Sequence, residues 1–230
     1  MWQDIDRYPV IPISATWERL AEWDGIVFLI AGGMLFVATA NDALGAYTSL
    51  TTQAGIPLAM EAVAGFGGLV LAIVGLVGLY PRLADRSPRL ARIGAGLVAL
   101  PAAVFAVLIT CAIPAGTLGI PSPAIVIPEL DTIVIAGFLM AAVGAIVFGI
   151  AALRERTLSH VLGGSLLLLG VAWFLLFGAT FLNGFPIAHR VVLATGVLQT
   201  PALFGTGYAL HLDPEAADRP RILVDRSTED

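Results

Sequence analysis

Apolar residues dominate six runs of this chain, each close to the roughly 20 residues that a helix needs to cross a bilayer. The runs cover approximately Asp24–Leu44, Ala59–Tyr80, Ala91–Ile113, Thr132–Leu153, His160–Leu182 and Val191–Leu210. The longest break between them, Pro114–Glu129, is rich in proline and glycine, and we expect it to be an external loop and not helix. The pattern predicts an all-α, polytopic membrane protein built as a bundle of six transmembrane helices.

The segments on either side of the six-helix domain (24–210) have other patterns. In residues 1–23, apolar and charged side chains separate onto opposite helix faces from Ser14 onward, with Trp17 on the apolar face. We expect a short interfacial helix on the cytoplasmic side, with its tryptophans at headgroup level. Residues 211–230 are acidic and contain prolines, which is typical of a flexible cytoplasmic tail.

Composition agrees with a membrane protein, because 58% of the 230 residues are hydrophobic and only 13% are charged. All twelve basic residues are arginines, so no lysine can form a retinal Schiff base or a pyridoxal phosphate imine. Arginine-only basicity with seventeen acids resembles the composition of halophile proteins. We expect the protein to be surrounded by lipid and to form a homo-oligomer or bind a membrane partner subunit. We do not expect it to bind nucleic acid.

The arginines predict the orientation. They occupy alternate connections and the tail: Arg82, Arg86, Arg89, Arg92, Arg154, Arg156, Arg219, Arg221 and Arg226. The other connections hold only Arg190. Because positive residues stay on the cytoplasmic side, we expect a multi-pass protein of the cell membrane with both termini in the cytoplasm.

Small residues repeat along three of the runs and predict close helix packing. These ridges are Ala64, Gly68 and Ala72; Ala91, Ala95, Ala99 and Ala103; and Gly137, Ala141, Ala145 and Gly149. Short echoes also link the two halves of the chain. Gly96–Ala102 and Gly196–Ala202 share G-x-x-x-x-P-A, and E-x-D-x-I-V opens the first and fourth runs. They suggest a 3+3 inverted repeat, as in secondary transporters. A rival match of 64–66 with 136–138 implies parallel helix pairs, and chance similarity is a third explanation.

The sixth run carries the main candidate site. Thr195, Gln199 and Thr206 share one helix face, and Thr200 precedes Pro201, whose ring removes a backbone hydrogen bond. We expect Gln199 to face the bundle interior, because an amide exposed to acyl chains is costly. This face either lines a ligand path shared with Pro101 of the third run or bonds across a helix interface.

Charged residues at the outer helix ends form a second candidate cluster: Asp42, Glu61, Glu129, Asp131, His189 and Arg190. If they converge, they would bind a cation or hold Arg190 in an ion pair; otherwise they are surface groups. Haem is not expected, because His160 and His211 lie at helix ends. The sequence contains no catalytic motif. It favours a non-enzymatic membrane protein that acts by packing with itself, a partner subunit, lipid or pigment; the alternative is a small secondary transporter with a site between the third and sixth helices.

Overall fold

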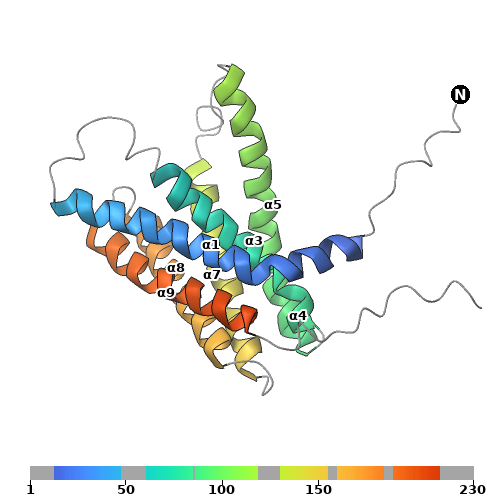
Figure 1. Ribbon diagram of the computed structural model, residues 1–230. Coiled ribbons are helices and arrows are strands. Elements are labelled where there is room, and N and C mark those ends of the chain that lie inside the picture. Colours follow the sequence, from blue (N-terminus) through green and yellow to red (C-terminus); the bar gives the residue numbers. More distant parts are fainter. Residues whose placement is uncertain are drawn as a thin grey trace, which may run out of the picture.

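The computed structural model describes residues 13–47, 61–84, 86–118, 130–154, 160–183 and 189–212, and every regular element in these ranges is a helix (Figure 1). The elements are α1 (Ile13–Tyr47), the π-helix η3 (Glu61–Phe66), α3 (Gly67–Gly78), α4 (Tyr80–Ala84), α5 (Pro88–Leu118), α7 (Leu130–Arg154), α8 (His160–Asn183) and α9 (His189–His211). Helices cover all six predicted runs, which confirms the all-α fold class.

Four helical segments in these ranges are long and apolar enough to cross a membrane: Val63–Ala84, Pro88–Leu108, Leu130–Arg154 and His160–Phe181. They are consistent with a multi-pass integral membrane protein. The apolar part of α1, Gly25–Asn41, is shorter. Helix α9 is not among the four, since Gln199 and three threonines make it less apolar.

The beginning of the chain differs from the prediction. We expected a surface helix over residues 14–23, separate from a spanning helix that begins at Asp24, whereas the structure has one continuous helix, α1. No proline occurs between Ile13 and Tyr47, so no residue there lacks the backbone N–H that continues the helix. Residues 1–12 and 213–230 lie outside the described ranges, and the tail prediction falls there.

The predicted loop Pro114–Glu129 begins too early. Helix α5 continues through Pro114 and ends at Leu118. A proline removes one hydrogen-bond donor and crowds one carbonyl, which bends a long helix more readily than it ends it. Residues 119–129 lie outside the described ranges, and Figure 1 shows the C-terminal end of α5 projecting beyond its neighbours.

The long helices form a closed ring. Helix α1 packs on α3, α3 on α5, α5 on α7, α7 on α8 and α8 on α9, and α9 returns to α1. Glycine contacts show that neighbours are antiparallel: Gly25 of α1 meets Gly207 of α9, while Thr39 further along α1 meets Gly196. Helices α5 and α9 therefore lie opposite each other in the ring, and residues pointing to its centre form the core.

Two of the three predicted small-residue ridges pack against neighbouring helices, and the third does so only in its first half. The ridge of α7 packs as predicted: Ala141 and Ala145 are fully buried, and Gly149 lies against Gly163 of α8. The ridge of α3 also packs, with Gly68 against Leu35 of α1. The predicted ridge of α5 is wrong beyond its first half, because Ala99 and Ala103 are exposed. Their face of α5 turns away from both α3 and α7.

Candidate functional site in the bundle interior

The polar face of α9 points into the bundle. Thr195 is 3% exposed, Gln199 is 6% exposed and Thr206 is fully buried. Their spacing of four and seven residues places all three on one face. This confirms that the Gln199 amide faces the interior.

Gln199 is bonded to a tryptophan of the neighbouring helix. The indole Nε1 of Trp173 in α8 donates a hydrogen bond to Oε1 of Gln199 over 3.1 Å, and Trp173 is fully buried. Both residues lie well inside their helices, where an unpaired indole N–H or amide carbonyl would be costly. Sequence reasoning missed Trp173. The signal was a tryptophan in the middle of an apolar run, whose N–H needs an acceptor.

Two of the threonines are bonded within α9. The Oγ1 of Thr195 donates to the carbonyl of Val191, and that of Thr206 donates to the carbonyl of Ala202, both over 2.8 Å. Such bonds to the preceding turn satisfy a hydroxyl in an apolar environment without a ligand.

Thr200 is the exception on this helix. Its Oγ1 is buried, and it has no hydrogen-bond partner within the described ranges. The next residue, Pro201, has no N–H and cannot donate to the carbonyl of Val197 four residues earlier. An unpaired hydroxyl and a freed carbonyl thus occur within one turn of α9. Within the described interior, this is the position whose polar groups most lack hydrogen-bond partners in the protein.

An aromatic cluster fills the interior beside Trp173. Phe138 of α7 is its centre: its ring lies 4.4 Å from that of Phe177, stacked, and 4.7 Å from that of Phe105. Trp173 and Phe66 contact Phe138 edge to face, with centroids 6.1 Å and 6.4 Å away. Rings from η3, α5, α7 and α8 therefore pack together in favourable geometries. Phe105, Phe138 and Trp173 are buried, whereas Phe66 is partly exposed at the edge of the cluster.

Pro101 lies on the other side of this cluster. It is buried at the α5–α7 interface, where a Cβ added to Gly137 would lie 3.4 Å from its Cβ. Pro201, by contrast, is exposed. The repeated G-x-x-x-x-P-A motifs also differ at their glycines, because Gly96 faces open space and Gly196 packs on Thr39. The two motifs do not share a packing environment, and the structure does not bring the two prolines together.

An apolar cavity of about 300 Å³ lies between α3 and α5. Seven residues line it: Val70, Ile73, Val74, Ala102, Phe105, Ala106 and Thr110. Ala106 and Thr110 are exposed, so the cavity is partly open to the surroundings of the bundle. Thr110 has the only side-chain hydroxyl among these lining residues, and its Oγ1 donates a hydrogen bond to the carbonyl of Ala106. The cavity suits an apolar group, and sequence reasoning did not predict it.

The predicted charge cluster at the outer helix ends is only partly described. Asp131 is exposed in the first turn of α7. The backbone of Asp42, Glu61, His189 and Arg190 is helical, but their side chains lie outside the described part of the structure, as does all of Glu129. Convergence of these groups stays a prediction. Among the described residues, no three His, Cys, Asp or Glu side chains are placed to hold a metal ion.

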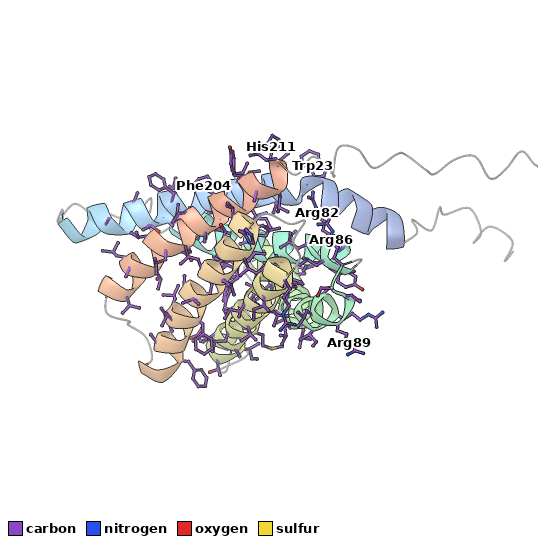
Figure 2. All side chains as sticks on the ribbon, turned by 90° about the horizontal axis from the view of Figure 1, so that it is seen from below. Trp23, Arg82, Arg86, Arg89, Phe204 and His211 are labelled. Atoms are coloured by element: carbon purple, nitrogen blue, oxygen red, sulfur yellow. The ribbon has the colours of Figure 1, made fainter. Side chains whose placement is uncertain are left out.

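The opposite end of the bundle carries the arginines. Arg82 and Arg86 on or beside α4 are half-buried, whereas Arg89, Arg92 and Arg154 are exposed. Figure 2 shows Arg82, Arg86 and Arg89 toward the same end of the bundle as Trp23 and His211. Trp23 is 59% exposed, and an exposed tryptophan beside arginines is typical of a membrane–water boundary.

A ring of helices that includes four segments long and apolar enough to cross a membrane is consistent with an integral membrane protein of the helical-bundle class. The chain matches no protein-family model, no curated protein and no solved structure. Its function therefore has to be inferred from the geometry.

Proposed function

We infer that this chain is a non-enzymatic protein of the cell membrane, whose six long helices cross the bilayer with both termini and the arginine-rich end in the cytoplasm. It acts through helix packing, with a second copy, a partner subunit, or lipid or pigment at its surface. The observation that carries this proposal is the buried hydrogen bond between Trp173 and Gln199, packed beside the aromatic cluster. The amide side chain in the middle of α9 is used to join two helices.

The surface supports the same function. Exposed apolar side chains occur on α1, α5, α7, α8 and α9, for example Phe36 on α1, Val107 on α5 and Phe174 on α8. In a bilayer this surface meets acyl chains or other helices. The cavity between α3 and α5 is also apolar and partly open, so it fits a lipid-soluble group better than an ion or a polar substrate.

Water access at Gln199 tests this proposal. In a C111S background, the variants Q199C and D131C are reconstituted in liposomes and treated with a water-soluble maleimide. Asp131 is exposed in the first turn of α7, so D131C should react rapidly. Q199C should stay unreacted, because its position is buried between α8 and α9. Reaction of Q199C at a rate near that of D131C would disprove a dry interior.

The alternative, a secondary transporter built on a 3+3 inverted repeat, is favoured by one observation. The buried hydroxyl of Thr200 has no partner within the described ranges and lies beside Pro201. In transporters, interrupted helices offer such groups to a substrate. A transporter must open the aromatic cluster between α5 and α9 during its cycle. Rapid labelling of Q199C or of T200C from one side of the membrane would support this alternative.

A further inference from the structure

Three exposed arginines lie at one end of the bundle, where α5 begins and α7 ends. Arg89 and Arg92 lie in the first two turns of α5, and Arg154 is the last residue of α7. The two helices are antiparallel neighbours, with Phe148 of α7 packed directly against Gly94 of α5. The start of α5 and the end of α7 therefore lie at the same level of the bundle. We name Arg89, Arg92 and Arg154 the arginine cluster.

An exposed apolar strip continues from this cluster along both helices. On α5, Ile93 and Leu100 follow Arg89 by four and eleven residues on one helix face, and they are 54% and 56% exposed. On α7, Ile150 lies one turn before Arg154 and is also exposed. Positive charge thus stands at one end of a surface that is otherwise apolar. A molecule that fits both parts must itself be amphipathic.

Positive charge also dominates the nearby sequence. From Arg82 to Arg92 the chain has four arginines and one acid, Asp85; residues 154–156 have two arginines and one acid. Arg82 and Arg86 already take part in interactions within the protein, whereas the three side chains of the arginine cluster are exposed. A guanidinium binds a phosphate through two parallel hydrogen bonds and keeps its charge at any physiological pH.

We propose that the arginine cluster binds the headgroup phosphates of anionic phospholipids, whose acyl chains lie along the apolar strip of α5 and α7. This inference rests on the membrane placement proposed above and names lipid as the partner. The acidic tail of the chain is the competing occupant, but it would match only the charged part of the surface. Each arginine at an anionic leaflet strengthens lipid binding by roughly fivefold, so removing three should weaken it by at least tenfold.

The test uses the full-length protein in nanodiscs of phosphatidylglycerol and phosphatidylcholine in equal amounts and with the same acyl chains. Lipids retained on the protein are counted by native mass spectrometry. The wild type should retain phosphatidylglycerol preferentially, and R89Q/R92Q/R154Q should lose at least tenfold of that preference. The matched control R7Q/R221Q/R226Q removes the same net charge from the terminal segments and should keep the preference.

Two results would overturn the proposal: no preference in the wild type, or an equal loss in the control. If a preference then appears after residues 213–230 are deleted, the acidic tail is the occupant of the arginine cluster. If the triple variant does not fold, the salt dependence of the lipid preference of the wild type tests the proposal instead. Raising the salt from about 50 mM to about 500 mM should abolish a preference that depends on exposed arginines; a preference that salt does not change contradicts it. Discs of pure phosphatidylcholine distinguish failure of the lipid-binding proposal from failure of the proposed function. A protein that does not insert into these discs contradicts the membrane placement itself.

Discussion

The indole of Trp173 in α8 donates its hydrogen to the side-chain oxygen of Gln199 in α9 over 3.1 Å, and both side chains are buried. This bond joins the last two helices of the ring, and the burial of both side chains separates them from solvent. Hydrogen bonds between membrane helices are nevertheless weak on average, because the unfolded chain in a membrane also finds partners.

A double-mutant cycle should measure this bond. We expect W173F and Q199L each to lower the free energy of unfolding, and the coupling between them to be about 0.6 kcal/mol, the average for such bonds. The measurement is reversible unfolding in mixed micelles. Both single variants should fold, because each replacement is apolar. Phenylalanine is smaller than tryptophan, so W173F also loses packing, which the cycle separates from the coupling. Coupling of zero would mean that the two side chains do not interact in the folded protein.

Glycines of α8 provide a matched pair for close packing. A Cβ at Gly170 would lie 2.7 Å from the carbonyl oxygen of Ala142 and 3.0 Å from the backbone nitrogen of Ile146 in α7. A Cβ at Gly164, on the same helix, would meet nothing within 4 Å. We expect G170A to destabilise the protein by about 1–3 kcal/mol through overpacking. We expect G164A to be neutral or stabilising, because alanine favours helix over glycine.

Thr200 distinguishes a packing function from a transport function. Valine has nearly the shape of threonine but lacks the hydroxyl that has no partner within the described ranges. If the interior serves only packing, T200V should be as stable as the wild type or more stable by about 1 kcal/mol, because a buried unpaired group is removed. T206V is the control: it deletes a hydroxyl bonded to the carbonyl of Ala202 and should not stabilise. A stability loss in T200V would mean that the hydroxyl has a partner in the membrane.

The orientation can be measured at the two ends of α5. In a C111S background, S87C lies just before α5 on the arginine-rich side, and S122C lies in the connection to α7. With an impermeant maleimide on intact cells, we expect S122C to react and S87C to react only after the cells are opened. The reverse pattern would place both termini outside and invert the side assigned to the arginine cluster.

Arg190 should be paired with an acid at the outer end. It lies in the first turn of α9, where the positive end of the helix dipole disfavours a cation. Asp131 and Glu61 are at the same end of the bundle, at the starts of α7 and η3. We expect R190Q to couple with D131N or with E61Q by about 0.2–1 kcal/mol, the range for exposed pairs. If neither acid shows coupling, Arg190 is held by another group.

The apolar pattern alone determined where the long helices lie and that the fold is all-α, because a helix in lipid must satisfy its own backbone. It also placed Gln199 on an inward face, since four-residue spacing with two threonines leaves one side of α9 polar. Its errors lie at helix ends. There, α1 continues because no proline interrupts it, and α5 passes through Pro114 because a proline bends a long helix more readily than it ends it.

Only the tertiary structure decided which helices meet. No spacing in the sequence pairs Trp173 with Gln199, because they lie 26 positions apart on different helices. The same is true of the two proline motifs, which read alike but lie in opposite environments: Pro101 is buried and Pro201 is exposed. A side chain's surroundings follow from the order of helices around the ring, and in lipid that order depends on close backbone packing that a linear apolar pattern does not encode.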